Sequence, residues 1–168
     1  AGGGVWEGVR AGNCLKEYDI RHLFFAAENT KLIKNRPAGS LVQNTGKEKK
    51  MKMSRDEFLR ALSEGRREFR GIDLRGQDLR GLDLCGADLS RTDLACADMR
   101  WADLRWARLN QADLWLADLE GANLEGAYLV QADLNGANLE GANLEGAYLM
   151  QVDLSGADLE GANLKRAY

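Results

Sequence analysis

Apolar residues recur at every fifth position through the last three-fifths of the chain. Leu occupies this position, here termed the centre, from Leu74 to Leu164, with Met99 as the one substitute inside that span and Phe69 one step before it. Ala stands two residues before the centre in nearly every repeat from Ala97 onward. Side chains alternate along an extended segment, so the centre and the Ala point to one side and the polar residue between them to the other. The pattern predicts short extended segments with an inward apolar side.

Glycine follows two residues after many centres, as at Gly71, Gly121 and Gly126. Glycine is favoured where a chain bends sharply, because it lacks a Cβ atom and accepts left-handed backbone angles. Each pentapeptide therefore predicts one straight side followed by one corner.

A second period, of twenty residues, predicts how many sides close one coil. Residues 125–144 and 145–164 are two blocks of twenty that match at sixteen positions. Residues that break the five-residue rule repeat at the same interval, namely Gln111, Gln131 and Gln151, and Tyr128, Tyr148 and Tyr168. With four sides to a coil, each set becomes a column whose members lie about 4.8 Å apart. A duplication of twenty residues would give this spacing by descent, and its unit would still be one whole coil.

The repeated unit resembles the A(D/N)LxX motif of the pentapeptide-repeat family, from Arg67 to Tyr168. The resemblance implies an all-β fold, a right-handed quadrilateral β-helix in which Leu and Ala fill a narrow interior. At twenty residues to a coil, residues 67–168 are expected to make about five coils.

Residues 53–66 are expected to form a short α-helical cap on the first coil. Ser54 and Glu57 have the spacing of a capping box, Phe58 with Leu59 and Leu62 gives one apolar stripe, and Gly65 can end the helix. Such a helix can cover the open end of the core and prevent edge-to-edge pairing. The run from Phe58 into Gly71 also resembles the entry to the repeats in bacterial members of the family.

Residues 1–52 differ in composition from the repeats, since they carry ten basic residues against five acidic ones and lack a sustained apolar period. We interpret them as a basic, disordered tail or linker. An alternative is an upstream region translated in frame, with the natural start at Met51 or Met53.

The composition of the chain limits the remaining possibilities. Its 168 residues carry a net charge of −3 and contain no apolar run long enough to span a membrane. Cys85 and Cys96 are expected on opposite faces of a coil, which argues against a disulfide framework and favours a reducing compartment. We therefore expect a cytoplasmic protein without direct contact to a membrane.

Catalytic chemistry has little support among the outward positions. The one histidine, His22, lies in the basic segment, and no residue with a hydroxyl or thiol nucleophile has a histidine partner in the repeats. Five aspartates twenty residues apart, Asp73, Asp93, Asp113, Asp133 and Asp153, form one column. A cation site is one interpretation, but we expect solvated carboxylates. The sequence predicts no enzyme, cofactor or metal ion.

Charge is uneven along the repeats. Residues 110–168 hold ten acidic residues against Lys165 and Arg166, with Glu120, Glu140 and Glu160 in one column. Some members of the family imitate DNA with an acidic rod and bind type II topoisomerase such as DNA gyrase, which the resemblance makes the alternative function. The chain departs from those members in having few coils, no projecting loop and Leu rather than Phe at most centres.

Large aromatic and cationic residues at outward positions predict a protein-interaction surface, because Trp, Tyr and Arg are favoured at interface centres. The other interpretation is that these side chains are scattered round the coil and pack over neighbouring corners. The leading prediction is a non-enzymatic scaffold or protein-interaction module with an unknown protein partner and without direct binding to nucleic acid. The predicted surface consists of Trp101, Trp106, Trp115, Leu116, Arg105, Arg108, Tyr128, Tyr148 and Tyr168.

The repeats continue in register to Tyr168. An open coil leaves backbone groups that can pair with another chain. A weak homodimer through the C-terminal coil is therefore expected, opposed by the acidic charge near the joint.

Overall fold

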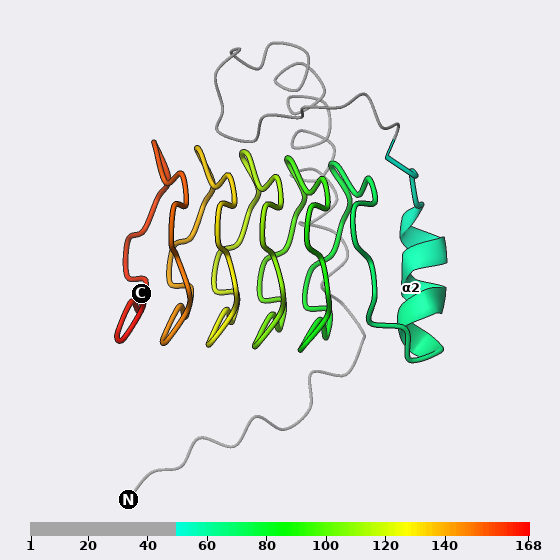
Figure 1. Cartoon of the computed structure of the whole chain (residues 1–168), viewed down its shortest axis with the longest axis horizontal. Helices are drawn as coiled ribbons and strands as arrows, with labels where there is room; N and C mark the ends of the chain where they lie inside the picture. The colour runs from blue at the N-terminus through cyan, green and yellow to red at the C-terminus, as the bar shows by residue number, and fades with distance from the viewer. Residues whose placement is uncertain (1–49) are drawn as a thin grey trace, which may run out of the picture. The chain divides into compact units, whose positions relative to one another are not determined.

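The computed structural model describes residues 50–168, which form one helix followed by a stack of coils (Figure 1). The helix is α2, Arg55–Ser63. Most of the predicted basic segment lies outside the described residues. No helix in the described part of the chain is long and apolar enough to cross a membrane.

The coils are held together by parallel backbone bridges between residues twenty positions apart, as between Asp73 and Asp93. Leu94 donates its N–H to the carbonyl of Asp113 in the next coil at 2.7 Å, while Asp93 donates to the carbonyl of Ile72 in the preceding coil at 2.9 Å. The twenty-residue period therefore corresponds to one coil of four pentapeptides, and the repeat β-solenoid is confirmed.

The β-structure of the solenoid consists of isolated bridges. Each side contributes one bridging residue, and no multi-residue strand forms among residues 50–168. A hydrogen bond closes each corner from Leu74 to Leu164, as between the Ala97 N–H and the Leu94 carbonyl at 3.0 Å, with Cys96 at a positive φ of 57° as in type II turns. These corners come every five residues, so only a short extended stretch fits between them.

The sides stack into four faces, named here by their outward bridging residues. They are face 1 (Asp73, Asp93, Asp113, Asp133, Asp153), face 2 (Asp78, Asp98, Asp118, Asn138, Asp158), face 3 (Asp83, Asp103, Asn123, Asn143, Asn163) and face 4 (Glu68, Asp88, Arg108, Tyr128, Tyr148, Tyr168).

The interior is filled as the sequence predicts. The centres from Leu74 to Leu139 are fully buried, and so are the substitutes Phe69 and Met99. Ala two before the centre is buried from Ala97 to Ala147. Burial decreases in the last coil, where Leu164 is 41% exposed. The Leu–Ala core therefore needs a neighbouring coil on each side to be covered.

The predicted capping box at the start of α2 is confirmed. The Ser54 N–H donates to Glu57 Oε2 at 2.8 Å, and the Glu57 N–H donates to Ser54 Oγ at 3.3 Å. Phe58 is fully buried and its ring centroid lies 4.5 Å from that of Phe69. The helix therefore joins the core of the coils through one aromatic contact.

The N-terminal edge of the first coil is covered on all four sides. Two sides receive backbone N–H groups, because Met53 donates to the carbonyl of Asp73 at 3.3 Å and Phe69 donates to that of Asp88 at 2.8 Å. The other two receive guanidinium groups, from Arg55 to the Asp78 carbonyl at 2.7 Å and from Arg67 to the Asp83 carbonyl at 3.3 Å. Backbone N–H and guanidinium groups thus occupy the carbonyls along this edge.

Candidate interaction surfaces

The outward Asp and Asn residues are used by the fold itself. Their Oδ1 atoms accept the N–H two residues later, for example Ala95 to Asp93 at 3.3 Å and Glu125 to Asn123 at 3.1 Å. This hydrogen bond stabilises a local turn of the backbone directly before the corner. It explains why the residue before the centre is so often Asp or Asn.

The expectation that face 1 is a column of solvated carboxylates is wrong. Asp73 and Asp113 are buried, and Asp133 has no exposed surface. Burial, followed by the charge of Asp113, raises the pKa of Asp93 to about 6, while Arg75 acts in the opposite direction. Within residues 50–168, no group of three or more potential ligands has the geometry to hold a metal ion.

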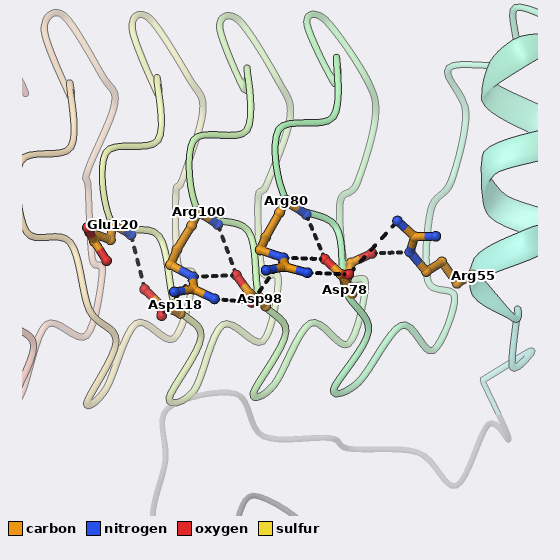
Figure 2. Close-up of polar contacts among 7 residues, drawn as sticks. All are labelled: Arg55, Asp78, Arg80, Asp98, Arg100, Asp118 and Glu120. Carbon is orange, nitrogen blue, oxygen red and sulfur yellow. Dashed lines mark hydrogen bonds and ion pairs between the residues drawn. The ribbon is translucent and has the colours of Figure 1, made fainter. Parts of the chain in front are cut away.

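Face 2 carries a ladder of alternating arginine and aspartate side chains (Figure 2). Arg80 binds Asp78 through Nε and Nη2, both at 2.9 Å, and its Nε lies 3.5 Å from Asp98 of the next coil. Arg100 repeats the arrangement, with 2.7 Å to Asp98 and 3.4 Å to Asp118. The hydrogen bond from Arg80 is the main cause that lowers the pKa of Asp78 to about 2.

The ladder ends where Glu120 replaces arginine. Figure 2 shows Glu120 one coil beyond Arg100, with its N–H donated to Asp118 at 3.2 Å. Burial raises the pKa of Asp118. Face 3 changes in the same way, since Arg105 pairs with Asp103 at 2.6 Å while Glu125 and Glu145 follow in the next coils. Faces 2 and 3 therefore change from balanced to acidic along the rod.

Face 4 has a different surface, made of aromatic and amide columns. The rings of Tyr128 and Tyr148 stack with centroids 4.8 Å apart, and those of Tyr148 and Tyr168 with centroids 5.4 Å apart. At the adjoining corner a chain of side-chain hydrogen bonds of 2.8–2.9 Å runs through Arg91, Gln111, Gln131 and Gln151. Both predicted columns are confirmed. Arg108 lies in the tyrosine column, 3.8 Å from Asp88.

Six consecutive corners in the middle of the stack lack glycine although each has a positive φ between 53° and 60°. They are Arg91, Cys96, Trp101, Trp106, Gln111 and Leu116. Left-handed backbone costs a residue with a Cβ atom roughly 1–2 kcal/mol. Trp101, Trp106 and Leu116 lie over the corner glycines of the next coil, where an added Cβ on Gly121, Gly126 or Gly136 would meet their side-chain atoms within 2.6 Å.

The residues of the predicted interaction surface do not form one patch. Trp101, Arg105 and Trp106 gather around face 3, with the two indoles 50% and 54% exposed. The three tyrosines and Arg108 lie on face 4. Trp115 is buried at the end of face 1, next to the half-buried Leu116. Trp101, Trp106 and Leu116 pack over neighbouring corners, as the alternative interpretation of the sequence predicts.

The ion-pair ladder was not part of the sequence prediction, although the sequence contains a signal for it. Arg75, Arg80, Arg100 and Arg105 each stand two residues after an aspartate. Residues two apart in an extended segment project from the same side. A repeated Asp-x-Arg triplet therefore predicts bidentate pairs, and the twenty-residue period predicts that they stack.

The comparisons with known proteins agree with the repeat fold. A family model described as pentapeptide repeats, with eight copies, matches residues 68–105, 97–136 and 127–166. Among curated proteins, no significant sequence match is found.

Three solved structures illustrate the similarity. A pentapeptide repeat protein from the Arabidopsis thaliana thylakoid lumen is 37% identical over 55% of this chain and 65% of its own length, with a TM-score of 0.54. Another, from Nostoc Pcc 7120, is 36% identical over 66% of this chain and 98% of its own, with a TM-score of 0.57. A plasmid-mediated fluoroquinolone resistance protein is 20% identical over 60% of this chain and 63% of its own, with a TM-score of 0.42.

Proposed function

The chain belongs to the pentapeptide-repeat family, and on that premise we propose that it is a non-enzymatic protein-interaction module of the bacterial cytoplasm. The observation that supports the proposal is that outward side chains fall into two groups, those that the fold itself uses and those that vary from face to face. The bridging Asp and Asn residues accept backbone N–H groups within the fold, while the residues after each centre and at each corner differ from face to face. Those variable positions are where a partner would be recognised.

The proposal includes the finer architecture. A right-handed quadrilateral coil, closed at one end by α2 and the guanidinium groups of Arg55 and Arg67, would act as a stiff scaffold. Stiffness favours binding, because a surface that is already ordered loses little conformational entropy on association.

The proposal is tested by isolating a partner with the full chain. Purified protein is immobilised, incubated with a bacterial lysate and cross-linked, and retained proteins are quantified by mass spectrometry. The expected result is one protein retained in near-stoichiometric amount, which then binds the purified chain in a two-component titration. A lysate that yields no protein able to bind in the purified titration would contradict the interaction function.

A second candidate is an acidic mimic of DNA that binds a type II topoisomerase. The observation that favours it is the acidic part of faces 2 and 3, where Glu120, Glu140, Glu125 and Glu145 follow one another without an intervening basic residue. A DNA gyrase supercoiling assay distinguishes the two functions. Inhibition that duplex DNA relieves, and that Glu140→Gln with Glu145→Gln weakens, supports the mimic. Unchanged supercoiling at concentrations well above that of the enzyme excludes it.

A further inference from the structure

Trp101 and Trp106 occupy the two corners that bound face 3, and each is paired with a glutamate of the next coil. The backbone N–H of Trp101 donates to the backbone carbonyl of Glu120 at 3.0 Å, and the backbone N–H of Trp106 donates to that of Glu125 at 3.0 Å. Each indole lies over the glycine that directly follows its glutamate, Gly121 or Gly126. The coil register therefore places one half-exposed indole and one carboxylate-bearing residue side by side at two successive corners.

The fold does not require tryptophan at these corners. In the same two columns, every other coil except the last one at Arg166 carries glycine with positive φ, as at Gly81 and Gly141 in the column of Trp101, and at Gly86 and Gly146 in the column of Trp106. Both tryptophans hold left-handed backbone, with φ of 57° and 58°, which glycine adopts without strain. Each indole packs over the next corner and still keeps about half of its surface exposed, so an aromatic face remains available for recognition at a strained position.

An exposed indole beside a carboxylate is suited to bind a planar cation such as a guanidinium group. An indole face attracts a guanidinium through its quadrupole, and a neighbouring carboxylate adds charge-assisted hydrogen bonds. The structure already contains one such contact, because the Arg100 guanidinium carbon lies 5.6 Å from the centroid of the Trp101 ring. No basic residue occurs between Arg108 and Lys165, whereas ten acidic residues do. Arg100 and Arg105, which lie at the two corners, pair with Asp98 and Asp103 of their own chain, and the charged residues of the coils that follow are all acidic as far as Lys165. The acidic residues from Glu120 onward thus complement a basic partner and repel nucleic acid.

We propose that Trp101 with Glu120, and Trp106 with Glu125, form a two-point docking site for an arginine-bearing segment of a protein partner. This inference rests on the proposed interaction function and specifies the chemistry of the partner. One side of the coil separates the two points, roughly 10 Å for three extended residues. Two arginines on the same side of an extended segment reach across this distance with their flexible side chains.

The probe is a fluorescein-labelled peptide of Gly and Ser that contains two arginines separated by one residue. Its control contains citrulline, which keeps the shape of arginine and removes the charge. Binding to the full chain is followed by fluorescence anisotropy and by the shifts of the indole N–H signals in NMR spectra. The arginine peptide should bind at least about tenfold more tightly than the citrulline peptide and should move the signals of Trp101 and Trp106.

Two sets of variants locate the site. Trp101→Gly with Trp106→Gly, and separately Glu120→Gln with Glu125→Gln, should each weaken binding at least about tenfold. Gln111→Gly is the matched control, because Gln111 is the next corner of the same coil and has a φ of 59°. It should leave affinity within about twofold. Thermal melting of every variant shows whether it is folded. If the double glycine variant unfolds, the double glutamine variant still tests the site.

Several results would overturn the docking site. They are equal affinity for the arginine and citrulline peptides, no binding at millimolar peptide, loss of binding in Gln111→Gly, or indole shifts caused by a single-stranded oligonucleotide instead of the peptide. A lysate partner that binds the double glycine variant as tightly as the parent chain would refute this site while leaving the interaction function in place. Failure to obtain any partner would count against the function, not against peptide binding at these corners.

Discussion

A double-mutant cycle between Trp106 and Gly126 measures how the middle coil packs on the next one. An added Cβ at Gly126 would collide with the six-membered ring of Trp106, so Gly126→Ala must displace the indole. Gly146 is the matched control, because it has the same corner position one coil later, a φ of 65° and open space around a Cβ. Comparing the two alanine variants separates the packing of the ring from backbone strain.

The size of the effect follows from strain and from buried area. Gly146→Ala should cost about 1 kcal/mol, since left-handed strain of roughly 1–2 kcal/mol is partly offset by the lower entropy of the unfolded chain. Trp106 is 54% exposed, so it buries on the order of 100 Å², worth at most about 2.5 kcal/mol. Displacing the ring removes part of that area, and Gly126→Ala should cost about 2–3 kcal/mol in total.

Urea unfolding of the full chain, followed by far-ultraviolet circular dichroism, gives the four free energies of the cycle. In a Trp106→Gly background, Gly126→Ala should cost only about 1 kcal/mol, as at Gly146, which leaves a coupling free energy of about 1–2 kcal/mol. Equal costs at Gly126 and Gly146 in the parent chain would show that the indole does not lie over the next corner. A cost at Gly126 that Trp106→Gly fails to reduce would refute the same placement.

Four further predictions concern the core, the charges and self-association. Leu139→Ala should lower the unfolding free energy by about 2–5 kcal/mol through the cavity it leaves, and Ala137→Leu by about 1–3 kcal/mol through overpacking; normal stability of Ala137→Leu would mean that Ala137 is not inward. The pKa of Asp93 is about 6 in the folded chain and 3.8 in the reference state, so ionisation of Asp93 destabilises the fold as pH rises from about 4 to 6. Asp93→Asn should therefore raise the unfolding free energy by about 1–3 kcal/mol above pH 6 and leave it unchanged below pH 4. Urea unfolding at several pH values measures this difference. Arg100→Ala should cost about 3 kcal/mol because it leaves buried Asp98 poorly compensated, whereas the more exposed Arg105→Ala should lower stability much less. Equal midpoints in urea would contradict the difference in burial. Sedimentation at two protein concentrations should detect a weak dimer that tightens at high salt, and a monomer under every condition would exclude association through the C-terminal coil.

The sequence predicted most of the fold because its periods are geometric. Columns such as Tyr128–Tyr148–Tyr168 determine that a coil contains twenty residues, and a five-residue step then determines four sides. Ser54 and Glu57 predicted the start of α2 because a capping box is a local arrangement. What depends on contacts within one coil, or along a simple column, could be worked out from spacing alone.

The candidate surface was harder to predict because exposure depends on several coils at once. Asp133 and Trp115 occupy outward positions in the pattern, yet both are buried in the structure. Outward describes the direction of a side chain and does not report what covers it. The role of aspartate as an acceptor for the N–H two residues later was also missed, although its fixed distance from the corner is visible in the sequence.

The inward residues repeat every five positions, whereas the surface columns repeat every twenty. This difference in period has a consequence for how such proteins change in evolution. Inserting or deleting one whole coil would lengthen or shorten the rod and leave every column continuous. Inserting a single pentapeptide ahead of Tyr128 would preserve each inward Leu and Ala but rotate all later residues by a quarter turn, moving the tyrosines from face 4 to face 1. Indels of five residues would therefore permute which surface chemistries are aligned while leaving the interior intact.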